Sequence, residues 1–200
     1  MVASNKTRRA AVSSYTLHRI DGDAWAEYRH LRLQALRDAH GFIGGNLSLE
    51  REWSEADWRA AIHAPGRATW LLWIDGRPVG MTGLCVDDPD YGRGVVAFRA
   101  SWIDPAHRGR GFTRHFHDVR LSWALHETAC AFAVVSHRTG NTPAEQAIRH
   151  AGFRHVATAA ADWPDGARAH EVIYELDLTR LRATKFPNSS ASPNVRALPS

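Results

Sequence analysis

The stretch Ser101-Trp102-Ile103-Asp104-Pro105-Ala106-His107-Arg108-Gly109-Arg110-Gly111-Phe112-Thr113 decides the fold of this chain. An apolar β-run ends in it, a proline and a glycine-rich turn follow, and an amphipathic helix then continues to about Glu127. A strand that leads through a glycine turn into a helix directs several backbone N–H groups at one point, and the helix dipole adds partial positive charge there. The sequence therefore predicts a cradle for phosphate at this turn.

Composition indicates one globular domain, which we place at residues 15–178. The 200 residues are 44% hydrophobic and include eight tryptophans, enough for one sizeable core. The two cysteines, Cys85 and Cys130, lie in apolar runs and are expected to be buried, reduced thiols. No apolar run has the length of a membrane span, and residues 1–14 lack the apolar stretch of a signal peptide. We therefore expect a soluble, cytoplasmic protein without a membrane partner.

The formal charge of +4 belongs to the ends of the chain. Residues 1–14 and 179–200 together carry seven lysines and arginines and no acidic residue, which leaves 18 basic against 21 acidic residues between them. Basic termini that contain serine, asparagine and proline are usually solvated, so we predict flexible tails at 1–14 and 179–200. This charge distribution argues against nucleic acid as a partner.

Periodicity in the first half predicts a strand at 15–20, a helix at 24–39 and a short helix that a capping box begins at Ser54. The apolar connection at 41–46 contains Phe42 and either lines a ligand site or covers the core. A hairpin follows at 69–74 and 79–86. The acidic turn at 87–94 lacks the ligand spacing of a calcium loop, so we expect no metal there.

The second half reads as a strand–helix–strand unit. A strand at 95–103 leads to the glycine turn, a helix runs to about 127, and the apolar run at 131–136 is a buried strand parallel to the first. A helix at 143–150 and a hairpin at 154–160 and 171–178 close the domain. The residues expected on the buried face of the long helix are Phe116, Val119, Leu121, Trp123, Ala124 and Leu125.

This order of elements, with its motifs, resembles the acyl-CoA-binding core of the GCN5-related N-acetyltransferases (GNAT). That family's turn reads Arg or Gln, two residues, Gly, one residue, then Gly or Ala, and residues 108–113 match it except for Thr113. Asn141 and the pair Gly152-Phe153 follow at the family's spacing. A Rossmann turn or a P-loop would need other glycine and lysine positions, which the chain lacks.

The resemblance implies an α/β fold: a mixed, mostly antiparallel sheet whose central parallel strands splay to admit acyl-CoA, with helices on both faces. It implies acetyl-CoA as co-substrate, with Gly109 and Gly111 close to the pyrophosphate and Arg108 and Arg110 at its rim. Asn141 would position the cofactor arm. The full set of expected cofactor-binding residues is Trp102, Ile103, Arg108, Gly109, Arg110, Gly111, Phe112, Thr113 and Asn141.

The catalytic side chains depart from the family's commonest form. Ile148 stands where many members place the tyrosine that protonates the leaving thiolate, and Ala97 stands where many place a glutamate. His137, at the end of the second parallel strand, is a candidate base, with a loop histidine as the alternative. Glu50 and Glu52 are further candidate bases, with solvated positions as the alternative.

We expect an N-acetyltransferase that acetylates a primary amine of a small molecule, an amine-bearing antibiotic or natural product being one example, or of a peptide N-terminus. Arg99 either faces the acceptor, where it would favour a carboxylate, or lies at the solvent surface. A non-catalytic acyl-CoA-binding or interaction module is the alternative, because Ala97 and Ile148 replace usual side chains. Proteins of this resemblance are frequently homodimers.

Overall fold

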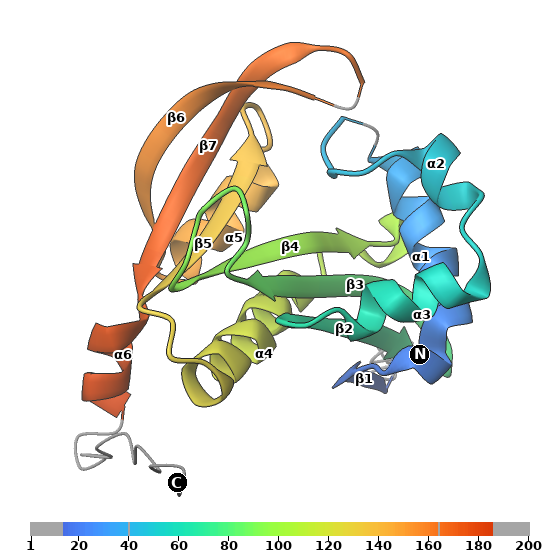
Figure 1. The fold of residues 1–200 in the computed structure, drawn as a ribbon, viewed down its shortest axis with the longest axis horizontal. Coiled ribbons are helices and arrows are strands. Elements are labelled where there is room, and N and C mark those ends of the chain that lie inside the picture. The colour runs from blue at the N-terminus through green and yellow to red at the C-terminus, as the bar shows by residue number, and fades with distance from the viewer. Residues whose placement is uncertain (1–13, 40, 164, 186–200) are drawn as a thin grey trace, which may run out of the picture.

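The computed structural model describes residues 14–39, 41–163 and 165–185, and these form a seven-stranded sheet in the order β1-β2-β3-β4-β5-β7-β6 (Figure 1). Neighbouring strands are antiparallel except β4 and β5, which are parallel. This is the mixed, mostly antiparallel sheet that the sequence analysis predicted. The elements of the first half are β1 (Tyr15–Arg19), η1 (Gly22–Ala24), α1 (Trp25–Asp38), α2 (Leu47–Arg51), α3 (Glu55–His63), β2 (Arg67–Ile74) and β3 (Arg77–Val86).

The second half follows the predicted strand–helix–strand order. Its elements are β4 (Val95–Ile103), η2 (Pro105–His107), α4 (Phe112–Glu127), β5 (Phe132–Arg138), α5 (Thr142–His150), β6 (Arg154–Asp162), β7 (Arg168–Asp177) and α6 (Leu178–Lys185). The boundaries differ from the sequence prediction by a few residues, as expected for end positions that local patterns define weakly. The capping box at Ser54 is confirmed, since Ser54 and Asp57 exchange hydrogen bonds with each other's backbone.

The two parallel strands separate part of the way along β4. Their pairing runs from Val95↔Phe132 to Phe98↔Val135, and the remaining residues of β4 pair with β3 alone. Ala100 has φ +53°, and the β3–β4 register shifts opposite it, between Met81 and Gly83. Such a bulge bends the strand and turns its backbone groups. The predicted splay is therefore present, and it leaves the outer backbone groups of β4 beyond Phe98 without a strand partner.

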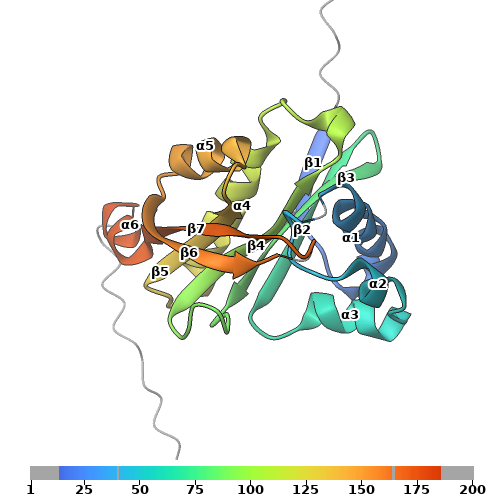
Figure 2. The same ribbon diagram turned by 90° about the horizontal axis from the view of Figure 1, so that it is seen from above.

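Helices cover both faces of the sheet, with α1, α2 and α3 on one side and α4 and α5 on the other (Figure 2). One buried cluster packs α1 and α3 on β2 and β3 and includes Leu31, Ile62 and Met81. A larger cluster lies under α4 and α5 and includes Phe98 and Ile148. No helix in the described ranges is long and apolar enough to cross a membrane.

The C-terminal end of the fold corrects the sequence analysis. Residues 178–185 form α6, although 179–200 had been assigned to a solvated tail. Arg182 donates hydrogen bonds to the carbonyls of Ala124, Leu125, Thr128 and Cys130, at distances of 2.8–3.1 Å. It thereby satisfies carbonyls at the C-terminus of α4, where a cation is also favoured by the helix dipole. Residues 1–13 and 186–200 lie outside the described residues.

Candidate active site

The glycine turn has the geometry that the sequence predicted. Gly109 and Gly111 have φ values of +72° and +81°, in the left-handed region that favours glycine. A Cβ atom at either position would meet no atom within 4 Å, so the backbone faces open space. Gly111 begins α4 without any side-chain cap, which leaves first-turn N–H groups free for a ligand. The buried ring of Phe112 anchors the turn in the core.

Arg108 and Trp102 hold this turn in place through Asp38 on α1. Trp102 Nε1 donates to Asp38 Oδ2 at 2.8 Å, and Arg108 donates to the same oxygen. Arg108 Nε also donates to the carbonyl of Ile103 at 2.9 Å. Burial alone raises the pKa of Asp38, but the hydrogen bonds from Trp102 and Arg108 outweigh it and lower that pKa. The side chain of Arg108 thus already has partners within the protein. Within the described residues, Arg110 hydrogen-bonds to His107 and lies over the Phe112 ring.

Asn141 and Thr113 lie where the cradle meets the cleft between the strands. Asn141 Oδ1 accepts from the Ala144 backbone N–H at 3.3 Å and so caps α5. Its side-chain NH2 group has no partner in the described residues and is available to a ligand. The Thr113 hydroxyl makes no hydrogen bond in the same ranges and does not cap α4.

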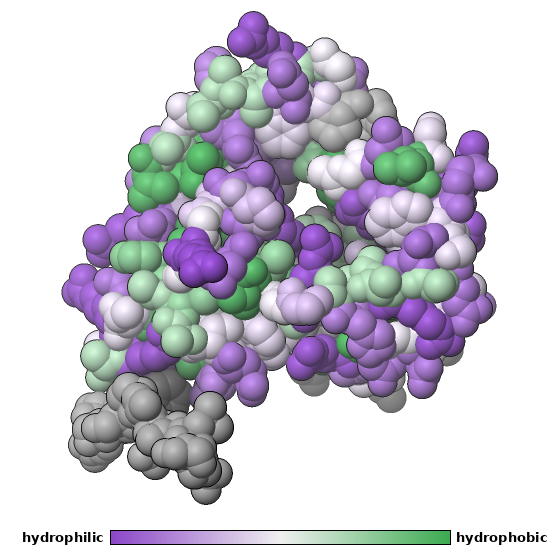
Figure 3. All heavy atoms as spheres, in the orientation of Figure 1, coloured by the Kyte–Doolittle hydropathy of each residue, from purple (hydrophilic) through white to green (hydrophobic). Residues whose placement is uncertain are grey.

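A cleft continues from the cradle into the splay. The part beside the cradle has a volume of about 550 Å³ and is lined by residues of β4, the glycine turn and the start of α5. The part inside the splay has a volume of about 410 Å³ and reaches from α4 and α5 to the β6–β7 hairpin. Figure 3 shows the surface hollowed between the half of the molecule that carries this hairpin and the half formed by the N-terminal elements. Ser101, Thr113, Asn141 and Ala144 line both parts.

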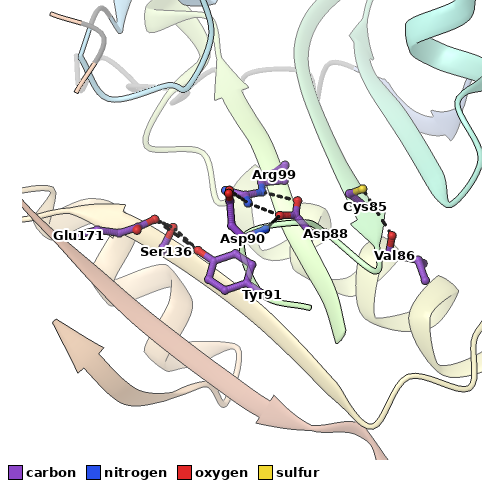
Figure 4. A network of polar contacts seen from close by, with 8 residues as sticks. All are labelled: Cys85, Val86, Asp88, Asp90, Tyr91, Arg99, Ser136 and Glu171. Atoms are coloured by element: carbon purple, nitrogen blue, oxygen red, sulfur yellow. Dashed lines mark hydrogen bonds and ion pairs between the residues drawn. The ribbon is translucent and has the colours of Figure 1, made fainter. Parts of the chain in front are cut away.

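Arg99 lines the inner cleft, but its charge is already neutralised (Figure 4). Its guanidinium donates to Asp88 at 2.7 and 3.0 Å and to Asp90 at 2.6 Å, and it lies 5.0 Å from the centre of the Tyr91 ring. Burial alone lowers the pKa of Arg99, yet the hydrogen bonds and charge of Asp88 outweigh it and raise that pKa. Arg99 therefore organises the β3–β4 loop, and this pairing argues against its selecting a carboxylate substrate.

Tyr91, Ser136 and Glu171 form a hydrogen-bonded group (Figure 4), and Ser136 and Glu171 line the cleft. Ser136 Oγ donates to Glu171 Oε1 at 2.5 Å, and the Tyr91 hydroxyl lies 3.2 Å from Ser136 Oγ and 3.3 Å from Glu171 Oε1. Burial raises the pKa of Tyr91, so its hydroxyl remains a donor at neutral pH. Sequence reasoning missed Glu171, because only the pairing of β7 with β5 brings it opposite the end of β5.

His137 lines the same cleft, as the sequence analysis expected. Its ring is buried, and it stacks on Tyr174 at 5.5 Å between centroids. Nδ1 donates to the Arg138 carbonyl at 2.8 Å, and Nε2 is buried with no hydrogen-bond partner among the residues that the structure describes. The ring therefore presents an acceptor nitrogen that is shielded from solvent in this conformation.

Glu50 and Glu52 lie apart from the cleft, which corrects their assignment as bases. Glu50 is buried and accepts two hydrogen bonds of 2.7 Å from Arg32, an arrangement that fixes α2 on α1. Glu52 is an exposed residue that pairs with Arg51 at 3.4 Å. Neither side chain lines the inner cleft or the part beside the cradle. Their spacing in the sequence gave no information about the side of α2 on which they lie.

Arg120 and His117 are polar residues on the buried face of α4 that the sequence analysis did not identify. Arg120 is 1% exposed and His117 is 3% exposed, and both line the inner cleft. By contrast Val119, Leu121 and Trp123, expected on that face, are only partly buried. No cluster of three or more His, Cys, Asp or Glu residues suited to a metal is found within the described part of the chain.

Residues 25–153 match the model of the acetyltransferase (GNAT) family, so the chain belongs to that family. Its fold is similar to that of a GNAT-family acetyltransferase from Streptococcus pneumoniae, with a TM-score of 0.70 at 12% identity over 82% of this chain and 99% of that one. A search of curated proteins finds no match.

Two further solved structures show the same likeness of fold. RimL, a ribosomal L7/L12 α-N-protein acetyltransferase in complex with coenzyme A, has a TM-score of 0.65 at 13% identity, over 84% of this chain and 95% of that one. Spermidine N-acetyltransferase from Vibrio cholerae, in complex with CoA and spermine, has a TM-score of 0.66 at 13% identity, over 82% of this chain and 96% of that one. At these identities the likeness establishes the fold alone.

Proposed function

We propose that this protein transfers the acetyl group of acetyl-CoA to a primary amine, either of a small molecule or of a peptide N-terminus. The observation that carries the proposal is the pair Glu171–Ser136, which lines the cleft beyond the point where β4 and β5 separate and is hydrogen-bonded to Tyr91. Two proteins of similar fold are named as acetyltransferases of a ribosomal protein and of spermidine. They support an amine as acceptor but do not distinguish a peptide N-terminus from a small molecule.

The charges around the cleft favour a cationic acceptor. Asp162 and Glu171 line it from the β6–β7 hairpin and Asp90 from the β3–β4 loop. The two arginines in the lining are Arg99, which is paired with Asp88 and Asp90, and Arg120 on α4, so carboxylates are in excess. A protonated amine would be attracted by this excess of acidic groups. The exposed ring of Phe42 and the ring of Trp163 supply apolar surface in the same wall.

The reaction requires that the ammonium lose a proton before its nitrogen attacks the thioester carbon. Glu171 is placed to accept that proton directly or through Ser136, with Tyr91 as a hydrogen-bond donor that keeps the group oriented. The new C–N bond then forms, the nitrogen gives its second proton to solvent, and the C–S bond breaks with the electron pair passing to sulfur. Backbone N–H groups of β4 beyond Phe98 are free to hold the carbonyl oxygen.

Replacement of the candidate base tests the proposal. We expect Glu171→Gln to lower kcat about 100-fold and to leave the KM for acetyl-CoA within about twofold, because a general base acts on the proton rather than on the donor. Release of free CoA with a panel of amines measures both constants.

His137→Gln is the matched comparison on the same cleft. A larger loss of kcat in this variant than in Glu171→Gln would assign the base to His137, the residue expected from the sequence. If wild-type protein binds acetyl-CoA and no amine accelerates CoA release, the chain is the acyl-CoA-binding module that Ala97 and Ile148 suggest.

A further inference from the structure

Arg120 is a buried cation without an anionic partner in the described residues. Its Nε donates to the Phe116 carbonyl at 3.0 Å, one terminal nitrogen lies 2.9 Å from Ser101 Oγ, and the other lies 3.3 Å from His117 Nδ1. The guanidinium also covers the Phe98 ring, 4.4 Å from its centre. Arginine is rarely buried this completely unless a carboxylate accompanies it, because leaving water is costly for a charge. The site therefore holds uncompensated positive charge.

This charge lies at the splay itself. Phe98 is the last residue of β4 that pairs with β5, and Ser101 is an exposed residue that lines both parts of the cleft. A guanidinium has five N–H bonds, and three are used by the contacts above, so two remain for a ligand. Ile148, which replaces the tyrosine usual in this family, lines the same cleft from α5. A positive group on α4 thus lines the same cleft as the position on α5 from which the family's acid is missing.

His117 stays neutral beside this charge. Burial, and then the positive charge of Arg120, lower the pKa of His117 to about 3. Because Arg120 donates to Nδ1, the single ring proton lies on Nε2, for which the described residues supply no acceptor. His117 therefore orients Arg120 without compensating its charge.

We propose that Arg120 stabilises the thiolate of coenzyme A as it leaves, in place of the acid that Ile148 cannot supply. When the tetrahedral intermediate collapses, the C–S electron pair moves to sulfur and the negative charge there is matched by the guanidinium, which stays protonated. The thiolate takes its proton from water after release. This inference rests on the proposed acyl-CoA site, not on the identity of the amine.

Titration of the thiol of bound CoA tests the proposal without any turnover. Burial lowers the pKa of Arg120 to about 9, so the thiol is titrated below that pH. Besides Arg120 and His117, the titratable or charged side chains that line the inner cleft are Asp90, Arg99, His137, Asp162 and Glu171. We expect the ultraviolet absorbance of the thiolate to show a pKa at least about one unit lower for bound than for free CoA, which is a tenfold higher thiolate-to-thiol ratio. Arg120→Met should remove this shift, and Arg120→Lys should keep part of it.

The analogue dethio-CoA, which lacks the sulfur, separates charge from structure. If Arg120 only holds α4 against the bulge in β4, Arg120→Met lowers the affinities for CoA and dethio-CoA equally at every pH. If Arg120 stabilises the thiolate, Arg120→Met lowers the affinity for CoA at high pH and leaves the affinity for dethio-CoA within about twofold. Ser101→Ala removes one hydrogen bond to Arg120 but keeps its charge, and should retain the shifted thiol pKa.

An unchanged thiol pKa in the wild-type complex overturns the inference even if Arg120→Met does not fold. Amine-dependent release of CoA is measured separately. A shifted thiol pKa without amine-dependent turnover would contradict the proposed function and support the thiolate site. Amine-dependent turnover with an unshifted thiol pKa would support the proposed function and contradict the thiolate site.

Discussion

At the scale of single residues, the cradle depends on backbone conformation more than on side-chain charge. Gly111 combines a φ of +81° with open space where a side chain would begin. Arg108, which the motif suggested as a phosphate contact, is turned toward Asp38. Recognition of a pyrophosphate at this turn would therefore rely on N–H groups at the start of α4 and on the helix dipole.

Gly111→Ala should weaken CoA binding about tenfold, because the added Cβ strains the turn and occupies the space that the cofactor would enter. Isothermal titration with CoA measures the change. Gly76→Ala is the matched control, since Gly76 has φ +75° and equally open surroundings but lies in the β2–β3 hairpin. The control should lose a similar ~1 kcal/mol of stability and bind CoA normally. Equal loss of CoA affinity in both variants would contradict this role of the turn.

At the scale of elements, α6 supports α4 from its far end. Arg182 reaches from α6 to the carbonyls that end α4, and α4 in turn carries Gly111 at one end and Arg120 on its buried face. The basic residues of the C-terminal region were read as a solvated tail, because a short polar helix has no strong hydrophobic period. Its role becomes visible only when α6 lies beside α4.

Arg182→Met should lower the free energy of unfolding by about 2 kcal/mol or more, since it leaves several helix-end carbonyls without donors. Urea unfolding followed by circular dichroism measures the loss. Arg180→Met, in the same helix but exposed, should change stability by less than about 0.5 kcal/mol. Similar losses in the two variants would show that α6 acts through its helicity rather than through the Arg182 contacts.

At the scale of the whole molecule, stability should depend on pH through His117. Its pKa is about 3 in the folded protein and about 6.5 when unfolded, so the unfolded chain binds more protons between these values. The contribution of neutral His117 to the free energy of unfolding is therefore fully present above pH 6.5. It falls as the pH decreases from there, by up to about 1.4 kcal/mol per pH unit. Asp38 has a lowered pKa, so its contribution is lost only at pH values below about 4.

His117→Gln should remove most of the loss between pH 6.5 and about 4.5, because glutamine cannot be protonated and can still accept from Arg120. Urea unfolding across this pH range gives the comparison. His150→Gln replaces an exposed histidine of α5 and should leave the wild-type pH dependence in place. A pH dependence of His117→Gln equal to that of the wild type would contradict the assignment.

From the sequence alone, the order of the strands and of α1, α3, α4 and α5 could be predicted, together with the glycine turn and the family's cofactor motif, whereas α2 and α6 were not predicted. These features depend on local periodicity, turn chemistry and helix capping, which act over a few residues. The homodimer stays a prediction, and so do the parts of the two predicted tails that lie at 1–13 and 186–200. The prediction of a tail is wrong for residues 179–185, which belong to α6.

Which side chains meet in the cleft depends on how the strands and helices pack. Glu171 joins Ser136 because β7 pairs with β5, and Arg120 lies behind Ser101 because α4 packs on the bulged strand. Glu50, a candidate base by its position in the chain, is instead paired with Arg32. Such neighbours are far apart in the sequence, and burial of a charged residue breaks the hydrophobic pattern on which prediction relies. The glycine turn could therefore be recognised from residues 108–113 alone, whereas the contacts of Glu171 with Ser136 and of Arg120 with Ser101 could not.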